Sequence, residues 1–325
     1  MDLSTEYLGL TIENPIIVAS SGLTKSADQI KKCEDAGAGA VVMKSLFEEQ
    51  IRNEDSGLDE SAMMHTEAFD YIRAEVDMLH GPRDYVEVIK EVKRSVTIPV
   101  IASINCYSAK WWISYAYELE AAGADALELN AYVLPFDSDK GSYAIENTYL
   151  EILQGVLEKI EIPISFKLSP YFTSFGNFAE KLDNQGVDGL VLFNRFIQPD
   201  IDLEKMENVL RPAFNDPVGF SHALRWVALL SGKLNLDIAA SGNIRTAEDI
   251  AKQILAGASA VQIASVLYRE GLGEIQSLLK DLKNWMDVKK FASIADIKGK
   301  LNQMNDPKSD TFVRAQYIKA FTGIE

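Results

Sequence analysis

Four polar side chains lie within or directly after short apolar runs, where a charge is costly to bury without a partner. Lys44 comes directly after one such run, and Lys167 lies inside another at 163–168. Asn130 and Asn194 end two further runs, and their amides both donate and accept hydrogen bonds. We therefore predict that these four residues face one small, anionic or electron-rich ligand.

A phosphate site is indicated by two apolar runs in the last third of the chain, which a helix connects. The first run ends at Ser241 and Gly242, and the second ends at Ser265. Small residues let backbone N–H groups approach a ligand closely. The last two strands of an eight-stranded α/β barrel hold phosphate in this way, although either position alone is equally consistent with a tight turn. Gly219, just ahead of the helix predicted at 223–232, adds a further backbone donor.

The elements that must position these residues repeat along the chain. Four segments share one pattern, a glycine that ends a helix followed by an apolar strand, and four further apolar runs lie between them. In the last repeat, Thr246 is expected to cap the helix and Gly257 to end it. Eight strands alternating with helices predict a single α/β domain over 1–325, a (β/α)8 TIM barrel, with a doubly wound sheet as the alternative. The repeated segments are 36–43, 122–129, 185–192 and 256–263, and the other runs are 15–19, 99–104, 163–168 and 238–240.

Three segments lie outside this repeat. Residues 7–12 are expected to form a hairpin that closes the barrel floor. Residues 46–82 are long for a strand-to-helix connection, and their acidic, methionine-rich sequence favours an active-site lid over a surface excursion without function. Residues 303–325 are expected to add a C-terminal helical extension.

The composition excludes several classes of function. With 325 residues and 47% hydrophobic content, the chain can bury one large core. A formal net charge of −16 argues against nucleic acid, which needs a basic face. Cys33, expected in the core, and Cys106 lack metal-ligand spacing and indicate a reducing compartment. We expect a cytoplasmic protein with no metal, membrane or nucleic-acid partner, which binds a small-molecule substrate and forms a homodimer.

Taken together, these motifs resemble the dihydroorotate dehydrogenase family of FMN-dependent barrels, and most closely its soluble class 1 branch. The resemblance covers nearly the whole chain and implies a flavoprotein with FMN as its cofactor. In that family a base removes a proton from the substrate carbon while hydride leaves the neighbouring carbon for flavin N5. The motifs that carry it are NPIIVASSG at 14–22, MKS at 43–45, ELN at 128–130, FKLSPYF at 166–172 and SIADIKGKL at 293–301.

The resemblance also implies a role for each residue. Lys167 would lie against the N1/O2 edge of the flavin ring, where its charge stabilises the reduced cofactor. Lys44 would act at the reacting centre, and Asn130 and Asn194 would hydrogen-bond the substrate or the ring. The implied cofactor-binding set is Ala19, Ser20, Gly22, Lys44, Ser45, Asn130, Lys167, Gly219, Ser241, Gly242 and Ser265.

The substrate side departs from the family pattern. Members of this branch carry Asn-x-Ser-Cys-Pro-Asn after strand four, with the cysteine as the base. Aligning the motif on Asn130 places Val133 at that cysteine, and valine cannot take a proton. Three side chains near Val133 could act as the base in place of the cysteine: Tyr132, Cys106 and Asp137.

The sequence therefore predicts an FMN-dependent oxidoreductase that acts on CH–CH bonds. The family reaction converts dihydroorotate to orotate in pyrimidine biosynthesis, but the missing cysteine indicates another small cyclic or anionic substrate. Two alternatives stay open. One is a catalytically silent flavin- or phosphate-binding barrel that acts through a partner protein. The other is a phosphosugar isomerase or aldolase barrel that uses Lys167 as a Schiff base.

Overall fold

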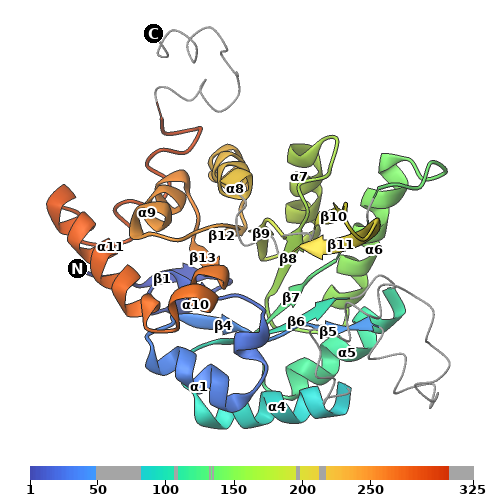
Figure 1. The fold of residues 1–325 in the computed structure, drawn as a ribbon, viewed down its shortest axis with the longest axis horizontal. Coiled ribbons are helices and arrows are strands. Elements are labelled where there is room, and N and C mark those ends of the chain that lie inside the picture. Colours follow the sequence, from blue (N-terminus) through green and yellow to red (C-terminus); the bar gives the residue numbers. More distant parts are fainter. Residues whose placement is uncertain are drawn as a thin grey trace, which may run out of the picture.

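A computed structural model describes residues 1–48, 82–105, 109–131, 133, 135–194, 198–211 and 217–306. Eight parallel strands close into a barrel, and helices surround it (Figure 1). This arrangement confirms the predicted (β/α)8 TIM barrel. The barrel strands are β3 (Ile16–Val18), β4 (Ala40–Val42), β6 (Val100–Asn105), β7 (Ala126–Leu129), β8 (Ile164–Leu168), β9 (Gly189–Leu192), β12 (Asp237–Ser241) and β13 (Ala260–Ile263).

The barrel closes where its first and last strands meet. β13 pairs with β3, β3 with β4 and β4 with β6, and the other neighbours follow in chain order. A short strand, β5 (Leu46–Phe47), pairs with the last residues of β6 beyond the end of β4. The segment predicted as a lid, 46–82, therefore begins with two residues of sheet. Its residues 49–81 lie outside the described part of the chain, as do residues 307–325 of the predicted C-terminal extension.

Glycines end four of the helices, as the repeated pattern predicts. Gly37, Gly123, Gly186 and Gly257 have φ of 91°, 98°, 97° and 117°. A side chain at such a φ is strained, so glycine lets the helix stop and the next strand begin at once. The helices are η1 (Gly22–Thr24), α1 (Ala27–Asp35), α4 (Pro82–Ser95), α5 (Ala109–Ala121), α6 (Ser142–Leu157), α7 (Phe175–Gln185), α8 (Pro217–Leu230), α9 (Ala247–Ala256), α10 (Ser265–Glu270) and α11 (Glu274–Lys289).

The starts of α8 and α9 test the predicted helix boundaries. Thr246 caps α9 as expected, because its hydroxyl accepts from Asp249 N at 3.2 Å while the Asp249 carboxylate accepts from Thr246 N. The predicted start of α8 is wrong, since the helix begins at Pro217. Proline fits the first helical position, where a backbone N–H has no helical partner in any case. Gly219 consequently lies in the first turn of α8 and not ahead of the helix.

An N-terminal hairpin closes the barrel floor, as predicted. Its strands β1 (Thr5–Tyr7) and β2 (Leu10–Ile12) pair with each other in antiparallel register. Tyr7, Leu8 and Ile12 are buried and pack against residues inside the barrel, so the floor is sealed by apolar side chains. The barrel residues of this cluster are Ile17, Ala40, Val42, Ile101, Ala126, Val191, Ala239 and Ala260.

The residues that point out of the barrel form a second and larger core with the helices. Cys33 of α1 belongs to it and is fully buried, which confirms the prediction of a core residue. Burial raises the pKa of its thiol to about 11, so the sulfur stays protonated and acts as a packing group.

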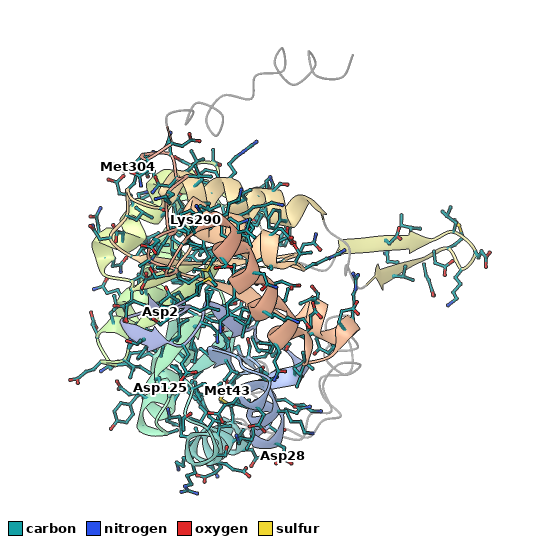
Figure 2. The ribbon with its side chains drawn as sticks, turned by 90° about the vertical axis from the view of Figure 1, so that its left-hand side faces the viewer. Asp2, Asp28, Met43, Asp125, Lys290 and Met304 are labelled. Atoms are coloured by element: carbon teal, nitrogen blue, oxygen red, sulfur yellow. The ribbon has the colours of Figure 1, made fainter. Side chains whose placement is uncertain are left out.

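A second hairpin leaves the barrel between β9 and α8. Its strands β10 (Gln198–Asp202) and β11 (Glu207–Arg211) pair only with each other among the described strands. Figure 2 shows the hairpin standing out from the rest of the molecule. Ile201, Leu203 and Met206 are exposed on it. This hairpin is not among the elements predicted from the sequence.

Candidate functional site

The predicted site residues gather at the carboxyl ends of the barrel strands. Parallel strands all end at the same rim of a barrel, so residues far apart in sequence meet there. Lys167 is the exception, because it lies within its strand and is deeper in the barrel. Ala19 and Ser20 follow β3, Lys44 and Ser45 follow β4, Asn130 follows β7, Lys167 is in β8, Asn194 follows β9, Ser241 and Gly242 end β12, Ser265 follows β13, Gly22 begins η1, and Gly219 is in α8.

The two asparagines are in direct contact. Asn194 Nδ2 donates to Asn130 Oδ1 at 2.7 Å. Their backbone N–H groups continue the sheet ladder, since Asn130 N donates to Ile104 O at 2.8 Å and Asn194 N donates to Leu168 O at 2.7 Å. The sheet therefore fixes both residues, and their amides can donate and accept hydrogen bonds at the rim.

Three serine hydroxyls join the ends of β3, β4 and β6. Ser20 Oγ accepts from Ser45 N at 2.9 Å and lies 3.0 Å from Ser45 Oγ. Ser45 Oγ lies 2.7 Å from Oγ of Ser103, which is fully buried. The loop after β3 is thereby tied to two neighbouring strands, so Ser20 and Ser45 occupy one ordered part of the rim.

Lys167 is held inside the barrel by two polar residues. Its Nζ donates to Gln262 Oε1 at 2.9 Å and lies 3.4 Å from Glu128 Oε1. Gln262 Nε2 in turn donates to Glu128 Oε2 at 2.5 Å. The side chain of Lys167 is 8% exposed and that of Glu128 is 0% exposed. The ammonium group is thus paired with a carboxylate and lies just below the rim.

The backbone after β12 forms a cradle of glycines. Gly242 has a φ of 108°, and a Cβ on it would lie 3.8 Å from both the C and O atoms of Gly219. The first turn of α8 therefore approaches the β12 turn closely, at the amino end of a helix whose unpaired N–H groups favour an anion. Ser265 begins α10, which follows the neighbouring strand β13. These three residues could together hold a phosphate group.

The loop after β3 crosses this rim beside α10. A Cβ on Gly22 would lie 2.7 Å from the Tyr268 hydroxyl, which is closer than side chains normally approach. A side chain at this position would therefore have to displace the Tyr268 hydroxyl.

Val133 packs against the outer core and its position is fixed by α6. Its backbone N–H donates to the Tyr149 hydroxyl at 3.0 Å, and Tyr149 is fully buried. Asp137, one candidate replacement base, accepts from Asp139 N at 3.0 Å and lies 3.7 Å from Lys140 Nζ, so it caps a surface turn. The other two candidates, Tyr132 and Cys106, lie outside the described residues.

Sequence reasoning missed Glu128, Gln262 and Tyr149. A signal existed for the first two, because a polar residue in the middle of an apolar strand needs a partner. Glu128 and Lys167 are opposite charges at inward positions of adjacent strands, which could have been paired. Tyr149 gave no such signal, since a tyrosine on a helix face is ordinarily a core residue.

The described residues offer neither a metal-ligand cluster nor a membrane-spanning helix. No group of three His, Cys, Asp or Glu side chains gathers there as metal ligands. None of the described helices is long and apolar enough to cross a membrane.

Comparison with known proteins gives one family. A family model described as Dihydroorotate dehydrogenase matches residues 2–286. The chain is 31% identical over 309 residues to a Thermoplasma acidophilum protein named dihydroorotate dehydrogenase B (NAD(+)), catalytic subunit, covering 92% of this chain and 98% of the relative. Proteins of the same name from Pyrococcus furiosus and Methanocaldococcus jannaschii are 29% and 27% identical, covering 92% and 86% of this chain and 98% and 94% of theirs.

Proposed function

Because the chain belongs to the dihydroorotate dehydrogenase family of oxidoreductases, we propose that it binds FMN and oxidises a small cyclic or anionic substrate other than dihydroorotate. The observation that carries the proposal is the position of a cation beside a phosphate cradle. Lys167 donates to Gln262, and Gln262 is the register neighbour of Ser241, which directly precedes Gly242. Gln262 on β13 thus links the cation on β8 to the turn after β12, and a flavin ring with its phosphate could use both features.

The residues present fit FMN. Gly242 has a left-handed φ of 108°, and a side chain on it would project toward the first turn of α8 at Gly219, where the phosphate would lie. Lys167 supplies the positive charge that favours an electron-rich ring edge. When bound, FMN would supply the hydride acceptor, while the chain would orient the substrate and exclude water. Asn130 and Asn194 would hold the substrate through their amides.

The proposed change of substrate rests on Val133. A general base contributes about 10²–10⁴-fold to a rate, and a valine side chain that packs against the core cannot take a proton. The substrate of this chain must therefore lose its proton to another group, or lose it more readily than dihydroorotate does. A homodimer and a cytoplasmic location belong to the same proposal.

The Schiff-base alternative is less well supported by the geometry. A nucleophilic lysine needs a neutral amine that can reach a carbonyl. Lys167 instead donates to Gln262 and is paired with a buried carboxylate. We therefore do not propose an aldolase or isomerase reaction.

The absorbance spectrum of the purified protein tests this proposal. We expect the two visible bands of bound oxidised flavin, either on isolation or after FMN is added and excess removed. A colourless protein that takes up no FMN would overturn the proposal and favour a phosphosugar ligand. Flavin that binds but is reduced by no candidate substrate under anaerobic conditions would favour the catalytically silent barrel. The mass of the FMN-loaded protein in solution tests the dimer.

A further inference from the structure

We propose that Glu128, acting with Gln262, balances the charge of Lys167 and so limits how much more tightly the protein binds reduced FMN than oxidised FMN. Glu128 is in this view a positioning residue, because it acts through Lys167. The inference rests on the proposed FMN site but concerns three side chains of this chain that the structure describes directly.

The three side chains form a closed group from three strands. Lys167 of β8 donates to Gln262 of β13 at 2.9 Å, and Gln262 donates to Glu128 of β7 at 2.5 Å. Glu128 lies 3.4 Å from Lys167 and completes the ring. All three are buried, and Glu128 has no exposed surface. Because the Gln262 amide accepts on one side and donates on the other, it can take only one orientation in this group.

The group carries no net charge. Lys167 contributes one positive charge, Glu128 one negative charge, and Gln262 none. A ligand above Lys167 therefore meets an ammonium group whose field is largely cancelled by a carboxylate behind it. Buried charges of this kind interact strongly, because little water screens them.

Two described phenols feel the charge of Glu128, those of Tyr7 and Tyr85, and neither adds a charge. Burial, together with the charge of Glu128, raises the pKa of Tyr7 well above its ordinary value. Burial also raises the pKa of Tyr85, against a hydrogen bond from Ser103 that lowers it. Both phenols stay neutral at ordinary pH, so the carboxylate of Glu128 is the group that offsets Lys167.

Substituting Glu128→Gln tests the inference. The amide keeps the size of the side chain but removes its charge, which leaves Lys167 uncompensated. Reduced FMN carries more negative charge than oxidised FMN, so its binding should gain most. We divide the dissociation constant of oxidised FMN by that of reduced FMN. We expect this ratio to rise at least about tenfold in the variant, the same free-energy change as a shift of one pKa unit. FMN titrations of the apoprotein, with and without dithionite under anaerobic conditions, measure both constants.

Glu146→Gln is the matched control. Glu146 is also nearly buried and is paired with a lysine, Lys181, at 2.9 Å, but this pair joins α6 and α7 outside the barrel. The same chemical change there should leave the ratio unaltered. An equal rise in both variants, or no rise with Glu128→Gln, would overturn the inference.

A second variant covers the possibility that Glu128→Gln does not fold. Glu128→Asp keeps the negative charge, but its shorter side chain holds the carboxylate farther from Lys167. The ratio of the dissociation constants of oxidised and reduced FMN should therefore also rise, by a smaller factor. An unchanged ratio in this variant would also overturn the inference. Failure of the unsubstituted protein to bind FMN would instead overturn the proposed function, and the two failures are therefore distinguishable.

Discussion

The hydroxyl of Tyr149 accepts a hydrogen bond from the backbone N–H of Val133 at 3.0 Å. Tyr149 is fully buried on α6, where its ring contacts Phe166, Phe172 and Phe178. An aromatic cluster thus fixes the phenol, and the phenol holds the backbone N–H of Val133. Val133 occupies a defined position beside the proposed substrate site.

Tyr149→Phe should destabilise the protein. The substitution removes this part-buried hydrogen bond, and such a bond contributes about 0.5–1.5 kcal/mol. We expect urea unfolding to show a loss of that size. Tyr143→Phe is the control, because Tyr143 lies on the same helix but is exposed. Equal stability of the two variants would contradict this account of Tyr149.

Gly242→Ala should weaken FMN binding. Gly242 has a φ of 108°, and an added Cβ would enter the cradle beside Gly219. A side chain in a left-handed conformation costs about 1–2 kcal/mol, so some stability should also be lost.

Gly186→Ala separates these two effects. Gly186 has a φ of 97° and nothing within 4 Å of an added Cβ, and it lies at the end of α7. Both variants should lose similar stability, as measured by urea unfolding, but only Gly242→Ala should bind FMN more weakly in a fluorescence titration. Equal FMN affinity of the two variants would place the phosphate elsewhere.

Lys167→Ala should destabilise the protein even without FMN. The substitution leaves Glu128 buried without its cation, and breaking a buried pair in this way costs about 3–5 kcal/mol. Lys181→Ala removes the cation of a partly exposed pair, for which about 0.2–1 kcal/mol is expected. Urea unfolding of the two apoproteins measures the difference. A small loss with Lys167→Ala would mean that Glu128 gains another partner in the variant.

Acid should destabilise the protein partly through Glu34. Burial would raise the pKa of Glu34, but hydrogen bonds from Thr97, Lys31 and Ile98 outweigh it and lower the pKa from 4.5 to about 2. The stability that this group contributes is complete above its unfolded pKa of 4.5 and is lost as the pH falls toward 2. In Glu34→Gln, the midpoint of urea unfolding should fall less steeply than in the natural sequence as the pH is lowered from 4.5 to about 2. A slope equal to that of the natural sequence would contradict the assignment.

The barrel could be predicted because its local signals agree with one another. Gly37, Gly123, Gly186 and Gly257 each mark a helix end, and all four have the positive φ that this role requires. Thr246 caps its helix through the hydrogen bonds expected of a threonine three residues before an aspartate. Such signals depend on neighbours in the sequence, so a single chain reveals them.

The polar character of the layer inside the barrel has a signal in the sequence, but the contact between Lys167 and Gln262 does not. The residues predicted at strand ends lie at one rim because parallel strands bring them together, as the contact between Asn130 and Asn194 illustrates. The contact between Lys167 and Gln262 depends instead on the register of β8 and β13, which are not adjacent in the sheet. Gln262 reaches Lys167 across the barrel from β13, a relation that strand order alone does not give.

The most direct test of the proposed function is single-turnover reduction of the FMN-loaded protein by dihydroorotate. Stopped-flow absorbance under anaerobic conditions should show slow or no bleaching of the flavin in the natural sequence. Val133→Cys should accelerate it, by up to the factor of about 10²–10⁴ that a general base supplies, and Val133→Ala should not. Fast reduction of the natural sequence, unchanged by Val133→Cys, would contradict the claim that this chain acts on a different substrate.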